Sequence, residues 1–256
     1  MTAGGSFAVP AEAYDRYIGR YSRRLAPRFL AFAGVAEGPV LDVGCGPGGL
    51  TEVLAQRLGA PGVAAVDLSE PFVQACRARV PGADVRRASA EDLPFADRTF
   101  RAALSQLVLS FVGDPSRAAA EMSRVVAPGG TVAACTFQSS GFALARTFWE
   151  AALRFDPRAP DDARLPFRRL PELVELWERT RLREVATEVV ELEVDYGDFD
   201  DFWAPFAFGI GPAGGYLVAQ PEDRRAAIRE ACFEALGRPS RPFSLPARVL
   251  AIRGRV

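Results

Sequence analysis

The residues of clearest chemical use lie in one short glycine-rich run, residues 44–49, which reads Gly-Cys-Gly-Pro-Gly-Gly. The apolar residues 40–43 precede it, and residues 50–55 after it are typical of a helix. A strand, a glycine turn and a helix N-terminus in this order bring backbone amides close to a nucleotide-like ligand, because glycine turns tightly and leaves no Cβ against it. The run satisfies the dinucleotide pattern G-x-G-x-x-G, which by itself is a weak signal.

Two carboxylates narrow the choice of ligand. Asp42 stands two residues before the first glycine, where it would repel a pyrophosphate and attract an ammonium group. Asp67 ends the next apolar run, residues 63–66, where an acid can accept hydrogen bonds from both ribose hydroxyls. S-adenosylmethionine has a ribose and an ammonium group but no phosphate, so it fits both carboxylates. A nicotinamide dinucleotide, with an oxidoreductase function, stays open as the alternative.

The order of motifs resembles that of the class I S-adenosylmethionine-dependent methyltransferases, particularly the small-molecule group similar to ubiquinone and menaquinone methyltransferases (methyltransferase type 11). The agreement runs from about residue 38 to 136, roughly half of the chain. The resemblance implies an α/β Rossmann-like fold, with a seven-stranded, mostly parallel sheet, an antiparallel last strand and helices on both faces. The matching segments, in order along the chain, are residues 42–48, 66–69, 88–97, 100–112 and 126–131.

The resemblance also implies which residues bind the cofactor. Ser89 departs from the family pattern, which often has Asp there to contact the adenine amino group. Because a hydroxyl accepts a hydrogen bond more weakly than a carboxylate, we expect the Ala90 backbone and Glu91 to carry more of that contact. The expected cofactor-binding residues on the strand ends are Asp42, Gly44, Cys45, Gly46, Gly48, Asp67, Leu68, Ser89, Ala90, Glu91 and Gln106.

The N-terminal segment is predicted to be a helix over residues 11–32, with tyrosines along one stripe. Tyrosines at helical spacing are more often packing residues than ligand contacts. In similar enzymes, however, this helix closes over the cofactor, and a Tyr or Arg reaches the methionine carboxylate. We therefore expect Tyr21 to make that contact, ahead of Tyr14 and Arg20.

Strand and helix signals alternate along the first 155 residues, which is typical of a parallel sheet covered by helices. Residues 1–9 are predicted to lack regular structure. We expect a single domain over residues 1–256, comprising an N-terminal helical cap (11–37), a cofactor-binding half (38–136) and a substrate-side half (137–256). The predicted strands are near 39–43, 62–67, 83–88, 101–108, 130–137, 182–194 and 243–256, and the helices near 49–58, 71–79, 115–127, 142–153 and 170–180.

An insertion between the last two strands, about residues 196–241, is rich in aromatic residues, glycine and proline. Aromatic rings supply rigid apolar contact area and glycines allow movement, so the segment is interpreted as a lid over the substrate. The alternative is a small hydrophobic core beneath a long loop. The predicted substrate-pocket residues are Phe111, Trp203, Phe206 and Tyr216.

Composition excludes several kinds of chemistry. The chain has a formal net charge of −1 and no His, and all 31 of its basic residues are Arg, so a histidine base or ligand and a Schiff-base lysine are absent. The four cysteines lack C-x-x-C spacing, so neither a metal site nor a disulfide framework is expected. Near-neutral charge argues against nucleic acid, and without a membrane span or signal peptide a cytoplasmic location is expected.

The predicted function is methyl transfer from S-adenosylmethionine to O, N or C of a small-molecule metabolite by in-line displacement. Asp198, Asp200, Asp201 and Tyr216 could supply a base, although the acids are more typical of a solvated loop, so no catalytic residue is assigned. Two further alternatives are a cofactor-binding protein that catalyses a non-methylating rearrangement or cyclisation, and a non-catalytic sensor. The acceptor and the oligomeric state stay open.

Overall fold

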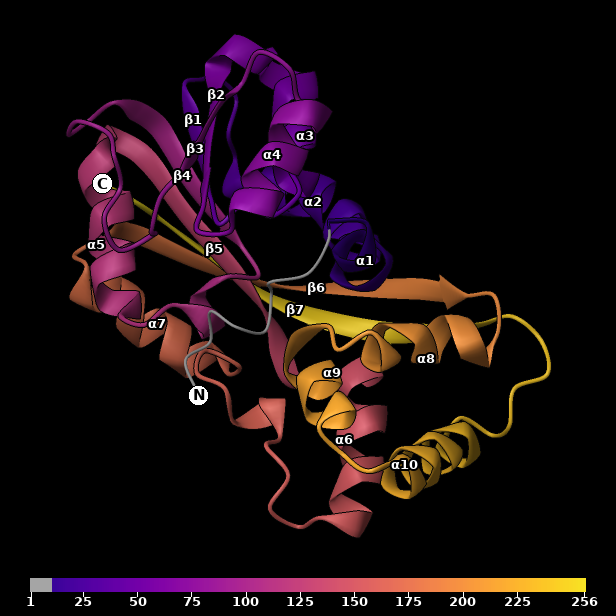
Figure 1. The fold of residues 1–256 in the computed structure, drawn as a ribbon. Coiled ribbons are helices and arrows are strands. Elements are labelled where there is room, and N and C mark those ends of the chain that lie inside the picture. Colours follow the sequence, from indigo (N-terminus) through magenta and orange to yellow (C-terminus); the bar gives the residue numbers. More distant parts are fainter. Residues whose placement is uncertain (1–10) are drawn as a thin grey trace.

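The computed structural model describes residues 11–256. A seven-stranded sheet runs through it in the order β3-β2-β1-β4-β5-β7-β6 (Figure 1). The first five strands are parallel, and β7 lies antiparallel between β5 and β6. This confirms the expected sheet with an antiparallel last strand. The strands are β1 Val40–Val43, β2 Val63–Asp67, β3 Asp84–Arg87, β4 Phe100–Gln106, β5 Val126–Phe142, β6 Arg183–Tyr196 and β7 Phe243–Arg255.

Helices cover both faces of the sheet (Figure 1). One face packs against α2, α3, α4 and α6, and the other against α5 and α7. The helices are α1 Ala11–Tyr14, α2 Arg20–Ala33, α3 Gly49–Leu58, α4 Glu70–Arg79, α5 Pro115–Val125, α6 Ala143–Phe155, α7 Leu170–Arg179, α8 Phe199–Ala207, α9 Gly211–Val218 and α10 Glu222–Ala235. Short turns of helix lie at η2 Asp15–Gly19, η3 Ala60–Gly62, η4 Leu109–Phe111 and η5 Asp162–Arg164. None of the helices within residues 11–256 combines the length and apolar character needed to cross a membrane.

Alternation along the strands decides which side chains face the site. In β1, Val40 belongs to the core on the α2 side, whereas Leu41 and Val43 belong to the core on the α5 side. Asp42 therefore points towards α2 and α3, because successive side chains of a strand point to opposite faces. In β4 the same rule places Leu104 and Gln106 on the α2 side.

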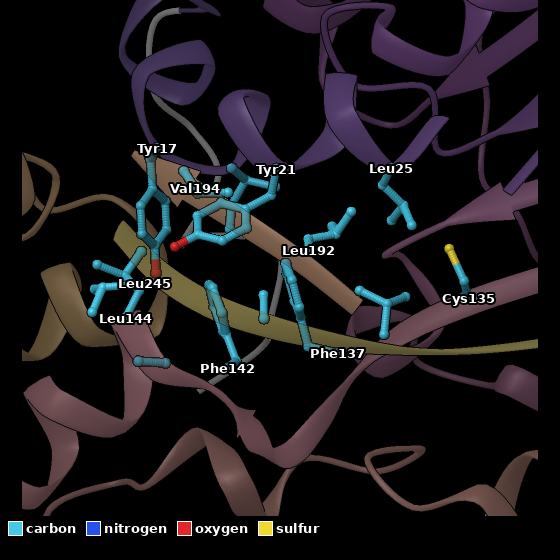
Figure 2. Close-up of a cluster of buried hydrophobic side chains, with 14 of the residues drawn as sticks. Tyr17, Tyr21, Leu25, Cys135, Phe137, Phe142, Leu144, Leu192, Val194 and Leu245 are labelled. Atoms are coloured by element: carbon cyan, nitrogen blue, oxygen red, sulfur yellow. The ribbon is translucent and has the colours of Figure 1, made fainter. Parts of the chain in front are cut away.

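Figure 2 shows the hydrophobic cluster that fixes the N-terminal segment on the sheet. Tyr21 and Leu25 of α2 are fully buried there, and the Tyr21 ring meets the rings of Phe137 and Phe142 edge-on. Those two phenylalanines stack in parallel with their centroids 3.9 Å apart, at a bulge in the carboxyl end of β5. The start of α2 is thereby held above the carboxyl ends of β4 and β5.

The expected elements between residues 11 and 196 are confirmed with small shifts in their bounds, and the prediction for residues 1–9 lies outside the described residues. The insertion, which was expected to be a loop-like lid, is helical. Three helices, α8 to α10, fill it and pack against α6 beside the β6–β7 hairpin (Figure 1). Most of its aromatic rings point inward: Phe202 and Phe206 are fully buried and Trp203 is 9% exposed, whereas Phe208 is 65% exposed. The apolar residues at helical spacing bury one another, which is the hydrophobic core that the sequence left as the alternative.

Candidate cofactor site

The glycine turn after β1 adopts the left-handed backbone that the sequence predicts. Gly44, Gly46 and Gly48 have φ angles of 75°, 53° and 96°. The amides of Gly44 and Cys45 both donate to the carbonyl of Val66, at 2.8 and 2.9 Å, so the turn is fixed to the end of β2. A Cβ on Gly44 would lie 2.4 Å from a methyl group of Val108. Gly44 is therefore required by both conformation and space.

Asp67 closes β2 beside this turn. Its carboxylate accepts hydrogen bonds from the Gly46 amide at 2.9 Å and the Ser69 amide at 2.8 Å, one on each oxygen. Burial raises the pKa of this carboxyl, and the two amides oppose the rise. Each carboxylate oxygen can accept a second hydrogen bond, so two hydroxyl groups of a ribose match its remaining capacity.

Asp42 lies deeper, below the turn, and is only 1% exposed. The Thr51 hydroxyl at the start of α3 donates to its Oδ2 at 2.7 Å, whereas Oδ1 is buried without a partner in residues 11–256. Burial raises the pKa of the Asp42 carboxyl to about 7. A buried acceptor of this kind favours a cationic partner such as an ammonium group, because charge pairing offsets the cost of burying the carboxylate.

Gln106 ends β4 and completes the floor of the site. Its Nε2 donates to the carbonyl of Ser22 at 3.2 Å and to the Ser22 hydroxyl at 2.7 Å. Its Oε1 is buried and has no partner within the described chain. Ser22 and Thr51 thus hold Gln106 and Asp42 in place, although neither was among the predicted site residues.

The N-terminal segment covers this site. Tyr14 packs on Phe72 of α4 with ring centroids 4.9 Å apart, and it lies directly over Gly46. Asp15 pairs with Arg79 and Arg23, which ties the segment to α4. The enclosed cavity has a volume of about 10 Å³, about the space of one water molecule. Its lining includes Tyr14, Asp15, Gly19, Ser22, Arg23, Asp42, Gly44, Cys45, Pro47, Gly49, Leu50 and Gln106.

Tyr21, which was expected to contact the cofactor, does not line the cavity in the structure. Its hydroxyl lies 2.6 Å from that of Tyr196, and its ring is fully buried in the cluster of Figure 2. Tyr14 lines the cavity instead, and Arg20 pairs with Asp201 at 2.6 Å. The π-helical turn η2 between Tyr14 and Tyr21 is the reason, because its wider turn rotates the two tyrosines off a common stripe.

Glu91, in the segment 88–97 that resembles the methyltransferase family, has a structural role. Glu91 Oε1 accepts hydrogen bonds from the amides of Gly113 at 2.8 Å and Asp114 at 3.1 Å, and so holds the loop before α5. Ser89 Oγ accepts from the Glu91 amide at 3.1 Å. Leu68, beside Asp67, is 60% exposed. The exposed apolar side chain of Leu68 therefore offers a flat surface beside the Asp67 carboxylate, whereas the Glu91 carboxylate is engaged by the loop before α5.

The predicted substrate-pocket residues do not gather at the cavity. Phe206 stacks on Phe148 of α6 with centroids 4.6 Å apart, and Trp203 packs on the same side of α6. The Tyr216 hydroxyl donates to Asp156 at 3.2 Å. Phe111 is half-buried in η4, after the carboxyl end of β4, so it alone of the four follows a strand end that borders the site.

The acids named as possible bases all have structural partners. Asp198 accepts from the Asp201 amide and caps α8, and Asp200 pairs with Arg229 at 2.6 Å. The hydrogen bond from Arg20 lowers the pKa of the Asp201 carboxyl. A carboxylate held by an arginine is a weak proton acceptor, so Asp201 is poorly suited to act as a general base.

Known proteins are similar to this chain in sequence and in fold. Residues 41–134 match the family model of a methyltransferase domain. The chain is 32% identical over 173 residues to the malonyl-[acyl-carrier protein] O-methyltransferase of Pseudescherichia vulneris, covering 67% of this chain and 66% of that protein, just under two thirds of its length.

Among solved structures, YcgJ of Bacillus subtilis has a TM-score of 0.59 at 16% identity, covering 91% of this chain and 99% of that one. The [4+2]-cyclase SpnF has a TM-score of 0.56 at 18% identity, covering 91% and 81%. At such low identity the structural similarity shows the fold alone.

Proposed function

Because the chain belongs to the class I S-adenosylmethionine-dependent methyltransferases, we propose that it transfers a methyl group from S-adenosylmethionine to an oxygen, nitrogen or carbon of a small-molecule acceptor. The observation that carries this proposal is the pair of carboxylates at the glycine turn, Asp42 buried and Asp67 half-buried. Asp67 has two hydrogen-bond positions left for a ribose, and Asp42 has an unpartnered oxygen suited to an ammonium group. The residues present therefore fit the group that the family uses.

Each residue of the site has a separate task in this proposal. Asp67 would hold the ribose, Leu68 and Ala90 the adenine, and Asp42, through Oδ1, the methionine ammonium group. Gln106 would face the reacting end of the cofactor, because it lies at the carboxyl end of the strand next to β1. Bound there, S-adenosylmethionine supplies an electrophilic methyl group that an acceptor can displace in line. The protein contributes alignment and exclusion of water.

Access to the site requires the N-terminal segment to move. A cavity of about 10 Å³ is far smaller than any nucleoside, and Tyr14 lies over the glycine turn. Residues 11–19 would therefore swing away from Gly46 for binding and close again over the cofactor. Closure would exclude water from the reacting atoms.

Oxygen is the acceptor atom to test first. The P. vulneris relative is named for O-methylation of a malonyl group on acyl carrier protein. A carboxylate or phenolate oxygen needs little help from a base, which agrees with a chain that has no histidine and whose acids 198, 200 and 201 have structural partners.

The first experiment is a calorimetric titration of the purified chain with S-adenosylmethionine, S-adenosylhomocysteine and NAD. We expect micromolar binding of both sulfur ligands and none of NAD. Asp67→Ala should weaken binding by about 100-fold or more, since it removes the ribose acceptor and releases the Gly46 and Ser69 amides. Asp84→Ala is the matched control, because that exposed acid begins β3 and pairs with Arg86. Well-folded protein that binds neither sulfur ligand would overturn the proposal.

Turnover separates methyl transfer from the two other readings. A screen of small acceptors that releases S-adenosylhomocysteine and yields a product heavier by one methylene unit would support the proposal. A product of unchanged mass without S-adenosylhomocysteine would favour a cyclisation or rearrangement. Binding without turnover across the screen would favour a sensor.

A further inference from the structure

One buried arginine outside the cofactor cavity has too few partners. Arg168 precedes α7 in a loop that runs along the carboxyl end of β5, where its own carbonyl accepts from the Ser139 amide at 2.9 Å. The residue is 5% exposed. Its backbone lies on the α7 side of the sheet, and its side chain reaches the Phe137 carbonyl of β5.

The hydrogen bonds of this guanidinium are few and poor. NH1 donates to the Phe137 carbonyl at 3.4 Å, near the limit of a hydrogen bond, and Nε is buried without any partner in residues 11–256. A guanidinium carries five N–H donors in a rigid planar fork. Burying a charge with most of its donors unused costs stability, and such groups are therefore candidates for binding a ligand.

The nearest opposite charge does not neutralise Arg168 by direct pairing. Asp161 is held by Arg146 at 2.7 Å, which leaves Asp162 as the acid that acts on Arg168 electrostatically. No carboxylate within the described chain comes close enough to form an ion pair with Arg168. Burial lowers the pKa of the guanidinium, and Asp162 and the Tyr17 hydroxyl oppose that effect. The capacity of the Arg168 guanidinium to form two parallel hydrogen bonds with one carboxylate is therefore unused.

The position of Arg168 relative to the glycine turn suits an acceptor. β5 is two strands away from β1 through β4, a separation of roughly 10 Å at the usual strand spacing. Both strands end at the same edge of the sheet, where α/β folds bind ligands. Tyr17, which acts on Arg168 and is visible in Figure 2, belongs to the segment that must move for the cofactor to bind. The same movement would therefore change the electrostatic surroundings of Arg168.

We propose that Arg168 binds a carboxylate of the methyl acceptor at the carboxyl end of β5, with the Tyr17 hydroxyl beside it. The inference rests on the proposed function and names the acceptor class. A carboxylate matches the planar fork of a guanidinium in two parallel hydrogen bonds. A single cation next to Asp162 suits a monoanion better than a dianionic phosphate, since a second negative charge there would have no partner.

The test is titration of the full chain, saturated with S-adenosylhomocysteine, with benzoate, phenylacetate and octanoate, and with their primary amides and phenyl phosphate. We expect at least one acid to bind and its amide to bind at least about tenfold more weakly. Arg168→Met should weaken binding of that acid by about tenfold or more. Arg168→Lys should weaken it by less, because lysine keeps the charge but loses the planar pair of N–H donors. Arg169→Met is the matched control, since this neighbour is exposed and pairs with Glu172.

Thermal unfolding separates a binding residue from a structural one. Since only one long hydrogen bond, to the Phe137 carbonyl, would be lost, we expect Arg168→Met to keep the melting temperature of the free protein or to raise it by a few degrees. A fall of more than about 5 °C would assign Arg168 to holding the loop and would overturn the proposal. So would acids that bind equally to both variants, preferential binding of phenyl phosphate, or no acid binding at all.

These outcomes are distinct from failure of the proposed function. If S-adenosylhomocysteine itself does not bind, the methyltransferase proposal fails, and the acceptor class that depends on it fails as well. If it binds with micromolar affinity and the acids do not respond to Arg168, only the present inference fails. The acid titrations are repeated without S-adenosylhomocysteine to show whether the two sites are coupled.

Discussion

The cofactor half of the molecule, β1 to β4, and the C-terminal half, β5 to β7 with α6 and α8 to α10, treat their buried polar groups differently. In the first half, Asp42 and Gln106 each keep a buried oxygen without a partner in the described residues. In the second, Tyr196 is bonded to Tyr21, and Tyr216 to Asp156. Gln138 of β5 and Trp149 of α6 also keep a buried polar atom without a partner in the described residues. What differs is the location: Asp42 and Gln106 line one cavity at the glycine turn, whereas the two tyrosine hydroxyls of the C-terminal half are bonded within its packing.

This contrast shows which property marks a site in this fold. Burial of aromatic rings identifies packing, because rings at helical spacing satisfy each other. Burial of a polar group with an unmet hydrogen bond identifies a place for a ligand, because its cost is offset only on binding. Arg168 follows the second pattern in the C-terminal half and is the cation among the residues there with such an atom, which also include Gln138, Trp149, Glu172 and Trp177. The predictions below separate the two halves by stability and by ligand affinity.

The largest expected effect is on packing in the C-terminal half. Phe206→Ala should lower the free energy of unfolding by about 3–5 kcal/mol, because it empties a fully buried site between α6 and α8. The affinity for S-adenosylmethionine should change by less than about twofold. Leu68→Ala should have the opposite effect. Because the Leu68 side chain is 60% exposed, the free energy of unfolding should change by less than about 0.5 kcal/mol, while the affinity for S-adenosylmethionine falls. Urea unfolding and calorimetry measure both. A reversed pattern would contradict the comparison.

A smaller loss is expected in the glycine turn. Gly44→Ala should cost about 3 kcal/mol of unfolding free energy, from its positive φ and from the clash with Val108. Gly129→Ala is the control, because Gly129 has a similar φ of 78° and nothing within 4 Å of the added Cβ. That change should cost only about 1 kcal/mol. Equal losses would mean that space at the turn is not limiting.

The pH dependence of cofactor affinity should follow Asp42. Its pKa of about 7 lies above the ordinary value of 3.8, so the folded chain binds this proton more tightly than the unfolded chain. Its contribution to stability is therefore present at low pH and lost as pH rises through 7. An ammonium group pairs with the ionised form, so affinity should rise by up to about tenfold per pH unit below 7 and level off above it. Calorimetry from pH 5.5 to 8 should give this slope for the natural chain and a flat profile for Asp42→Asn.

The smallest effect is expected at Tyr216. Tyr216→Phe removes one hydrogen bond to Asp156 and should cost about 1 kcal/mol or less. Turnover with an identified acceptor should be unchanged, since the hydroxyl is bonded away from the glycine turn. A loss of kcat by tenfold or more, with stability intact, would place Tyr216 in the reaction and weaken the contrast between the halves.

The sequence alone accounts for much of the fold and for the parts of the site that are local in the chain. The turn at residues 44–49, Asp42 before it and Asp67 at the end of the next strand follow from residue types and spacing, because adjacent parallel strands end at one edge. The strands and helices between residues 11 and 196 could be predicted from the spacing of apolar residues along the chain. The helices of the insertion were missed because proline and glycine, which stand at Pro205 and Gly211, are read as loop signals.

What only the tertiary structure decided depends on contacts between distant residues. The π-helical turn η2 separated Tyr14 from Tyr21, which sequence spacing had placed on one stripe. The Glu91 carboxylate accepts hydrogen bonds from the amides of Gly113 and Asp114, which are more than twenty residues away in the sequence. Residue types and periods determine strands, turns and the acids beside them, because those interactions are local. Which polar groups stay unsatisfied, as Arg168 does, depends on what the whole chain brings within hydrogen-bond distance, and no local pattern contains that information.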